Sequence, residues 1–291
     1  MVSIITPSLN QGHFIGDALA SVHCQQGVEV EHLVVDGGSR DETVAVVQAH
    51  ARRHPSRLHW LSEPDGGQAE AVNKGLRLAQ GEILGWLNAD DAYLLRSTLR
   101  EVVAAFNRYP ETDVIYGDGV LISVDNQLLK VLCMPPFSRA RLARRCCLLQ
   151  PAVFWRRHVS DAHQLDTTLA LAMDYEFWLR LSTRYRFRHV PRPWAADRNY
   201  PARRSLLRRA DLDAETCALQ TRHPAPPWPA WRRAAETLLV KWPDLARGLG
   251  WVPWLYAARR RLALPLGFGP LGAMVRNQLF RRVEELADAP A

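Results

Sequence analysis

The sequence predicts an α/β fold in which helices flank a mainly parallel sheet. In the first 120 residues, short apolar runs alternate with segments of helical periodicity. This alternation is typical of βαβ units. The apolar runs also end in Asp, Asn, Ser and Gly, and α/β sheets bind ligands beyond the carboxyl ends of their strands. Hydrophobic residues make up 47% of the 291 and charged residues 23%, which excludes an intrinsically disordered chain.

Four strands and their connecting helices are predicted in the first part of the chain. The strands are expected at 2–6, 30–36, 58–62 and 83–87, and the helices at 14–25, 68–79 and 96–109. Ser39-Arg40-Asp41-Glu42 has the sequence of a capping box. In such a box the Ser and Glu side chains each satisfy a backbone N–H, which predicts a helix from there to about Ala51.

The pattern changes after residue 112. A strand is predicted at 114–116, and the runs 120–124 and 127–132 flank Asp125-Asn126 as a hairpin. A short strand at 152–155 and a helix at 171–184 follow. We expect this part to be a mixed extension of the same sheet.

Polar residues follow all four strands of the first part. The four segments are Thr6-Pro7-Ser8-Leu9-Asn10, Asp36-Gly37-Gly38-Ser39, Ser62-Glu63-Pro64-Asp65-Gly66-Gly67 and Asn88-Ala89-Asp90-Asp91. Each segment alone also suits a turn or a helix cap. Four such segments at one edge indicate a binding site.

The sharpest of these signals is Asp90-Asp91. Two adjacent carboxylates repel each other unless a cation compensates them, and Mg²⁺ or Mn²⁺ is held in this way together with substrate phosphates. The alternative is an exposed pair that caps a helix. Asp36 suits a hydrogen bond to a base or ribose, or else a turn, and Gly37 allows close approach to a ligand. The chain contains no P-loop sequence.

Several segments together resemble family 2 glycosyltransferases of the GT-A fold. They are TPSLNQGHFIGDALASVHCQ, HLVVDGGSRDET, SEPDGGQAEAVNKGLRLAQGEILGWLNADD, LQPAVFWRR and AMDYEFWLRL, spread over about residues 2–200. The sequence looks most like members that build bacterial surface polysaccharides such as O-antigen and capsule. The resemblance implies a Rossmann-like GT-A domain with a helical C-terminal extension.

The resemblance also implies roles for the residues at the strand ends. Thr6 and Pro7 would border the nucleotide, Asp36 would contact the base, and Asp65 with Lys74 would border the donor site. Asn88 stands at the first acidic position of the family's DXD motif, which leaves Asp90 as the chief metal ligand and Asp91 as a second ligand or a sugar contact. The full expected set for the nucleotide sugar is Thr6, Pro7, Ser8, Asn10, Asp36, Gly37, Asp65, Gly66, Lys74, Asn88, Ala89 and Asp90.

For catalysis, Asp174 matches the family's general base. Glu176 is the competing candidate, and a plain helix N-cap is the structural alternative for Asp174. On the acceptor side we expect Gln150, Trp155 and Arg198, with core packing as the alternative for the tryptophan. Trp178 is interpreted as core. Arg198-Asn199-Tyr200 stands where relatives often have Arg-x-His.

The predicted function is that of a metal-dependent, inverting glycosyltransferase. The donor would be a nucleotide-diphosphate sugar, with UDP or dTDP favoured, and the acceptor a saccharide or lipid-linked saccharide. A divalent cation would stabilise the charge that develops on the departing diphosphate. A carboxylate would accept the proton of the attacking hydroxyl. A nucleotidyltransferase and a non-catalytic membrane scaffold are the two alternatives.

Charge divides the chain into unlike parts. Residues 1–130 carry a formal charge of −7, whereas residues 131–200 and 201–291 carry +7 each. We predict a catalytic domain over 1–200, with a nucleotide-sugar half (1–112) and an acceptor half (113–200). The extension 201–291 contains 14 Arg and five Trp. This composition predicts binding to an anionic membrane surface through residues 225–291, or else a helical cap on the catalytic domain.

The remaining sequence features concern partners and compartment. No nucleic-acid-binding motif accompanies the basic segments, so a nucleic-acid partner is not expected. The five cysteines show neither a zinc-binding nor a disulfide pattern, which indicates a reducing compartment. We predict a cytoplasmic protein at the inner face of the membrane.

Overall fold

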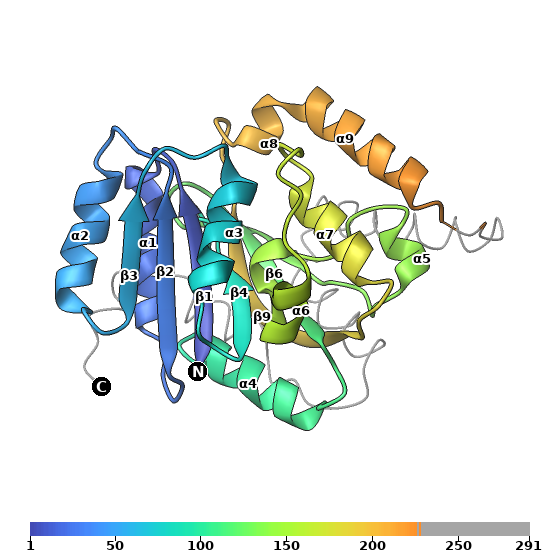
Figure 1. Ribbon diagram of the computed structural model, residues 1–291, viewed down its shortest axis with the longest axis horizontal. Coiled ribbons are helices and arrows are strands. Elements are labelled where there is room, and N and C mark those ends of the chain that lie inside the picture. Colours follow the sequence, from blue (N-terminus) through green and yellow to red (C-terminus); the bar gives the residue numbers. More distant parts are fainter. Residues whose placement is uncertain (226, 228–291) are drawn as a thin grey trace. The chain divides into compact units, whose positions relative to one another are not determined.

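A single mixed sheet forms the centre of the computed structural model (Figure 1), which describes residues 1–225 and 227. Its strand order is β3-β2-β1-β4-β8-β6-β9-β5, and β7 pairs with β6. The strands are β1 (Val2–Ser8), β2 (Val30–Asp36), β3 (Leu58–Ser62), β4 (Ile83–Trp86), β5 (Ala92–Tyr93), β6 (Val114–Ile122), β7 (Leu128–Leu132), β8 (Val153–Arg156) and β9 (Phe187–Arg198). Parallel pairing joins β3, β2, β1 and β4, whereas β8 runs antiparallel to both β4 and β6.

The helices follow the strands in the order that the sequence predicts for the first part. They are α1 (Gly12–His23), α2 (Thr43–Arg53), α3 (Gln68–Leu78), α4 (Thr98–Arg108), α5 (Arg139–Leu142), α6 (Arg157–Ala162), α7 (Met173–Leu181), α8 (Arg204–Leu207) and α9 (Arg209–Arg222), with a 3₁₀ turn η1 (Gln150–Ala152).

Alternate side chains of β1 pack against different helices. Ile4 joins Ala18 and Val22 of α1 in the main core cluster. Ile5 faces the opposite side, where it touches Gly75 of α3 so closely that a side chain at position 75 would collide with it. This alternation places α1 and α3 on opposite faces of the sheet.

The prediction of an α/β fold with a mainly parallel sheet is therefore confirmed, and the hairpin around Asp125-Asn126 is present as the antiparallel pair β6–β7. One prediction was wrong: residues 39–42 do not form a capping box. The Ser39 hydroxyl donates to Asp36 and accepts from the Asn10 N–H, so α2 begins only at Thr43 and its N-cap residue Glu42 makes no side-chain cap.

The longest strand, β9, was missed by the sequence analysis. It contains Pro191 and Pro193, which lack the N–H that a ladder needs. The pairing of β9 with β6 shifts register next to Pro193, which is how the sheet accommodates the proline.

Helix α9 lies in the predicted extension but hydrogen-bonds to the preceding part of the chain. Glu215 accepts the N–H groups of Ala170, Leu171 and Ala172 just before α7, at 2.7–3.0 Å. Gln220 donates to the Arg144 carbonyl. No helix of the described part of the chain is long and apolar enough to span a bilayer. The segment predicted to bind membranes lies outside the described residues, apart from 225 and 227.

Candidate active site

The loops after β1, β2 and β3 are held together by their own polar side chains. Asp36 is 1% exposed, and its carboxylate accepts from the N–H groups of Gly38 and Ser39 and from the hydroxyls of Ser39 and Ser62 at 2.5–3.1 Å. Arg40 donates its N–H to the Asn10 side chain. The Asp36 carboxylate therefore joins the loop after β2 to the end of β3.

Asp65 lies beside the glycine turn after β2. A Cβ atom on Gly37 would lie 3.0 Å from the Asp65 Oδ2, so glycine is needed for this close approach. Burial raises the pKa of the Asp65 carboxyl, and the nearby Asp36 carboxylate raises it further. Lys74, by contrast, forms ion pairs with Glu63 and Glu70 at 3.0 and 3.4 Å.

The other predicted donor residues differ in where their side chains lie. Thr6 is fully buried, and its hydroxyl is hydrogen-bonded to His32 at 2.9 Å. Pro7 pairs with Val35 in the β1–β2 ladder. The Ser8 hydroxyl is buried without a hydrogen-bond partner, and the Ser8 carbonyl accepts the Gly37 N–H. Gly66 donates its N–H to Glu70. The Thr6 side chain is therefore not available to a ligand, because it is fully buried and hydrogen-bonded to His32.

Asn88 is the centre of a hydrogen-bond network at the end of β4. Its Oδ1 accepts from Gln68 Nε2 and Trp86 Nε1 at 2.7 and 2.8 Å. Its Nδ2 donates to Asp91 Oδ2 and to Gln150 Oε1 at 3.2 and 3.0 Å. Gln150 in turn donates to the Trp86 carbonyl. Asn88 thus joins α3, β4, η1 and Asp91, while its neighbour Ala89 packs in the core.

The two adjacent aspartates have unlike surroundings. Asp91 is 1% exposed and precedes the strand β5, so the alternative of an exposed helix-capping pair is wrong. Asp91 Oδ1 accepts the Arg198 N–H, and burial together with Asp90 and Asp197 raises the pKa of Asp91 well above its usual range. Asp90 is half-buried, and its Oδ2 accepts from the Tyr200 hydroxyl at 3.0 Å.

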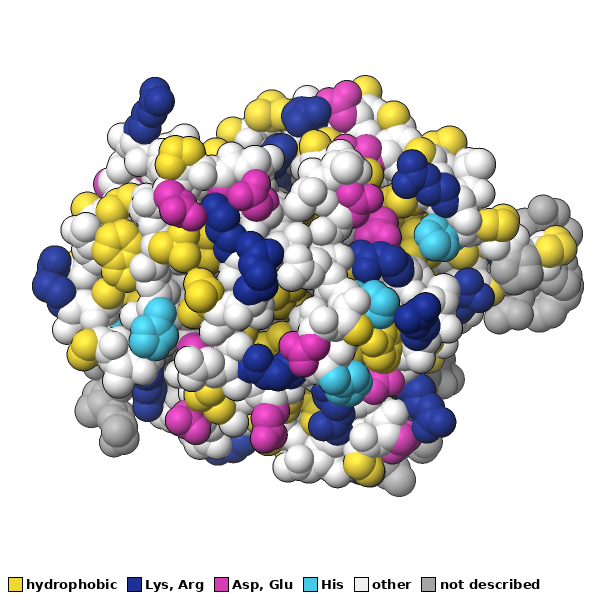
Figure 2. All heavy atoms as spheres, in the orientation of Figure 1, with side chains coloured by type: hydrophobic (Ala, Val, Ile, Leu, Met, Phe, Trp, Pro, Cys, Tyr) yellow, Lys and Arg dark blue, Asp and Glu magenta, His cyan; other side chains and the backbone are white. Residues whose placement is uncertain are grey.

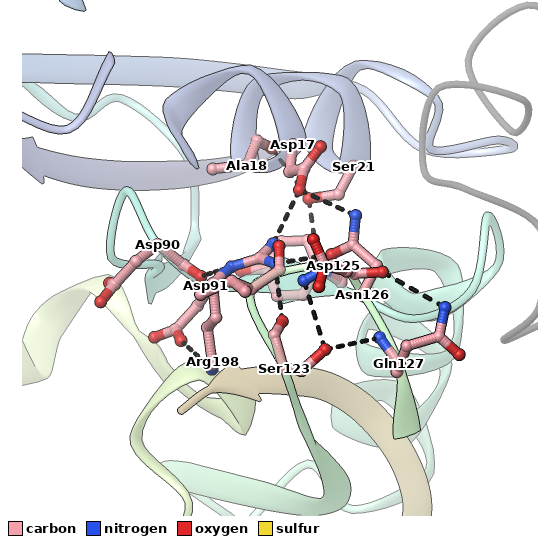
Figure 3. Close-up of polar contacts among 12 residues, drawn as sticks. Asp17, Ala18, Ser21, Asp90, Asp91, Ser123, Asp125, Asn126, Gln127 and Arg198 are labelled. Carbon is pink, nitrogen blue, oxygen red and sulfur yellow. Dashed lines mark hydrogen bonds and ion pairs between the residues drawn. The ribbon is translucent and has the colours of Figure 1, made fainter. Parts of the chain in front are cut away.

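Arg198 is fully buried, and Figure 3 shows its polar contacts next to these aspartates. Its guanidinium forms an ion pair with Asp17 at 2.7 Å and donates to Asn126 Oδ1. It also donates to the backbone carbonyls of Asp90 and Ser123. Arg198 therefore ties the Asp90 backbone to α1 and to the β6–β7 turn.

Asp174 and Glu176 occupy the first turn of α7 but point to different partners. Glu176 is 8% exposed and forms a two-point ion pair with Arg180, with both distances 2.8 Å. Asp174 accepts the Tyr175 N–H. Burial raises the pKa of Asp174 to about 6, and the charges of Arg203 and Asp197 also act on it. Asp174, Asp90 and Asp91 each interact electrostatically with Asp197, and these four residues together with Arg203 are called the charged cluster below.

Two members of this cluster were not predicted from the sequence, namely Asp197 and Arg203. They form an ion pair at 2.7 Å. Asp197 directly precedes Arg198, which the sequence analysis did single out. Its contact with Asp91 depends on the pairing of β5 with β9, and neither of these strands was predicted.

The predicted acceptor-side tryptophan lies in the core. Trp155 has no exposed surface, donates to the Ser160 hydroxyl and packs edge-on against Phe177 and Trp178. Trp178 is likewise fully buried, as expected. Of the three predicted acceptor-side residues, Gln150 is the one with exposed surface.

No group of three or more His, Cys, Asp or Glu side chains suited to hold a metal ion exists among the described residues. Asp90 is the carboxylate of the predicted pair with exposed surface. Mg²⁺ and Mn²⁺ are commonly held by one or two carboxylates together with substrate phosphates. The residues present therefore fit a cation that is completed by ligands from the substrate.

Comparisons with known proteins identify the family of this chain. The model of glycosyl transferase family 2 matches residues 3–141. An uncharacterized glycosyltransferase of Mycobacterium tuberculosis is 30% identical over 184 residues, which are 62% of this chain and 68% of the relative. A PGL/p-HBAD biosynthesis glycosyltransferase of Mycobacterium bovis is 32% identical over 157 residues, which are 54% of this chain and 59% of the relative. The chain belongs to glycosyltransferase family 2.

Solved structures share the fold. The mannosyltransferase PcManGT of Pyrobaculum calidifontis, in complex with GDP-Man and Mn²⁺, has a TM-score of 0.59 at 22% identity and covers 98% of this chain and 82% of its own. S. aureus TarS 1-349 in complex with UDP has a TM-score of 0.59 at 20% identity, over 78% of this chain and 67% of its own. The predictions of a GT-A fold and of a glycosyltransferase are thereby confirmed, and the nucleotidyltransferase alternative has no support.

Proposed function

We propose that this enzyme is a metal-dependent, inverting transferase that uses a nucleotide-diphosphate sugar. The observation that carries the proposal is that Asp174, a buried carboxylate of raised pKa, is linked electrostatically to Asp90 through Asp197. A group that takes a proton near neutral pH and a group that holds a cation are the two parts such a transfer requires. Glycosyltransferases of this fold that bind UDP or GDP-Man with Mn²⁺ support the donor class.

Asp174 is proposed as the general base. It would accept the proton of the acceptor hydroxyl while that oxygen attacks the anomeric carbon from the face opposite the diphosphate, so that a single displacement inverts the centre. Glu176 is proposed to be structural, because its carboxylate is already paired with Arg180.

Asp90 is proposed to hold the divalent cation together with the donor's diphosphate. The cation, when bound, would stabilise the negative charge that develops on the leaving group. Asp91 is proposed to position the neighbouring Asp90. Both oxygens of Asp91 already accept hydrogen bonds, one from the Arg198 N–H and one from the Asn88 amide.

The donor, the acceptor and the membrane position are proposed as well. We propose a UDP- or dTDP-linked sugar as donor, and as acceptor a saccharide or lipid-linked saccharide of surface-polysaccharide synthesis, of O-antigen or capsule type. The basic, Trp-rich composition of residues 225–291 supports a peripheral position on an anionic membrane.

The metal role is tested by the variant Asp90→Ala. We expect UDP to raise the melting temperature of the wild type more strongly with Mn²⁺ than without it, and Asp90→Ala to lose this Mn²⁺-dependent part. Asp213→Asn is the matched control, because it removes an exposed carboxylate on α9. A Mn²⁺ effect that is unchanged in Asp90→Ala would remove Asp90 from the cation site.

A further inference from the structure

The strand pair β5–β9 forces two carboxylates together. Ala92 pairs with Ala196 in antiparallel register. Asp91 and Asp197 each lie one residue beyond this pair, so they face each other across the ladder. Like charges in directly opposed positions are destabilising. A nearby positive charge would relieve this repulsion even when no substrate is bound.

Arg203 supplies that charge. Its Nη2 lies 2.7 Å from Asp197 Oδ1. Its backbone N–H donates to the Tyr200 carbonyl, and the Tyr200 hydroxyl donates to Asp90. The pKa values of Asp91 and Asp174 are raised by burial, and the charge of Arg203 partly offsets this increase. One guanidinium thus acts on both the proposed cation site and the proposed base.

Arg198, the fully buried arginine of this region, does not use its guanidinium to neutralise Asp91 and Asp197. The guanidinium of Arg198 turns to Asp17, to Asn126 and to backbone carbonyls (Figure 3). Only its backbone N–H reaches Asp91. Arg198 is fully buried, whereas the side chain of Arg203 is 26% exposed and lies between β9 and α8. The guanidinium of Arg203 can therefore move from Asp197 to another anionic group more easily than that of Arg198 can leave its partners.

We propose that Arg203 is an internal counter-ion of the carboxylates next to Asp90, and that its charge opposes the binding of a divalent cation at Asp90 while no nucleotide is bound. The inference rests on the proposed function, since it presupposes that Asp90 takes a cation. A free divalent ion at Asp90 would bind beside this tethered positive charge, which opposes its binding. A nucleotide diphosphate offers new oxygens both to the cation and to the guanidinium, which binds phosphate well. Cation and nucleotide are therefore expected to bind together.

The test is a Mn²⁺ titration of the full-length protein, with free Mn²⁺ followed by electron paramagnetic resonance, without and with UDP. Without UDP, Arg203→Gln is expected to bind Mn²⁺ at least about tenfold more tightly than the wild type, because the positive charge that is paired with Asp197 next to the proposed cation site is removed. With saturating UDP this difference should shrink. Arg203→Lys, which keeps the charge, should stay close to the wild type.

Arg204→Gln is the matched control, because it removes the same charge from the neighbouring, exposed position and should change the affinity less than twofold. The inference is contradicted if folded Arg203→Gln binds Mn²⁺ no more tightly than the wild type in the absence of UDP. It is also contradicted if neither Arg203→Gln nor Arg203→Met folds, because Arg203 would then be required for folding. A wild type that binds no Mn²⁺ even with UDP would instead contradict the proposed cation role of Asp90.

Discussion

Asn88 gives a physical reason for the departure from the family's acidic motif. Its side-chain amide is a donor to Asp91 and Gln150 and an acceptor from Gln68 and Trp86. A carboxylate at this position could keep the two accepted bonds but not the two donated ones. It would also add a negative charge next to a buried aspartate. Asparagine is therefore the residue that this network requires.

The variant Asn88→Asp tests this role. We expect its free energy of unfolding to fall by about 2 kcal/mol or more, because two donated hydrogen bonds are lost beside the buried Asp91. Urea denaturation at pH 7.5 measures the change. Asn107→Asp on the exposed surface of α4 is the control and should change stability little. An equal or higher denaturation midpoint for Asn88→Asp would refute the requirement.

Some residues of the candidate site were predictable from the sequence. Asp90, Asp91 and Asp174 were singled out from the sequence, and all three interact electrostatically with Asp197. The family resemblance favoured Asp174 over Glu176 as the base, although both stand in the first turn of one helix. Their difference comes from Arg180, one turn further on, which pairs with Glu176.

At the scale of elements, the strands of the parallel half were predictable because their apolar runs are continuous and end in turn residues. β9 was not, because its prolines and arginines resemble a loop. Its place beside β6 is decided by tertiary pairing. β9 brings Asp197 to the site, and Arg203 follows shortly after the strand. Both residues were missed because β9 itself was not predicted.

Four histidines from three elements also meet under the predicted donor-binding half. The ring of His23 in α1 lies near those of His32 in β2, His50 in α2 and His54 just after α2, with ring centroids 4.3–6.1 Å apart. Burial and the neighbouring histidines lower the pKa of His23 to about 2, and burial lowers that of His32 to about 3. Burial, and then Arg53 and His54, lower the pKa of His50. Burial, and then Arg57 and Arg53, lower the pKa of His54.

This cluster predicts loss of stability in acid. A histidine whose pKa is lower in the folded state contributes stability above its unfolded pKa of about 6.5, and that contribution is lost as the pH falls. We expect the free energy of unfolding to decrease below pH 6.5. In His23→Leu the decrease should be shallower by up to about 1.4 kcal/mol per pH unit. Urea denaturation between pH 7.5 and 4.5 measures both slopes.

The exposed His13 provides the control for this experiment, since His13→Gln should leave the slope unchanged. Equal slopes for His23→Leu and the wild type would show that the cluster does not set the acid stability.

At the scale of the whole molecule, the net charge of +7 is unevenly placed along the chain. On the face of the described part shown in Figure 2, acidic and basic side chains are interspersed. The basic excess of the C-terminal third falls largely on residues outside that part. The predicted membrane attachment therefore rests on composition: Trp and Arg together favour an interface with anionic headgroups.

Sedimentation with lipid vesicles tests the attachment. The full chain should sediment with vesicles that contain anionic phospholipid and should detach at about 1 M salt, where charges are screened within about 3 Å. Replacing Arg259, Arg260 and Arg261 by Gln should weaken binding in low salt, whereas zwitterionic vesicles should bind little. Partitioning that responds to neither salt nor these substitutions would contradict an electrostatic attachment.

The central claim, that Asp174 is the general base, is tested most directly by the pH dependence of kcat/KM for sugar transfer. Because the pKa of Asp174 is raised to about 6 and the base must be unprotonated, kcat/KM should fall about tenfold per pH unit below pH 6 and level off above it. Asp174→Asn should lower turnover at least about 10²-fold while UDP binding persists, and Glu176→Gln should keep the acidic limb. Wild-type turnover in Asp174→Asn, or loss of the limb in Glu176→Gln alone, would contradict the assignment.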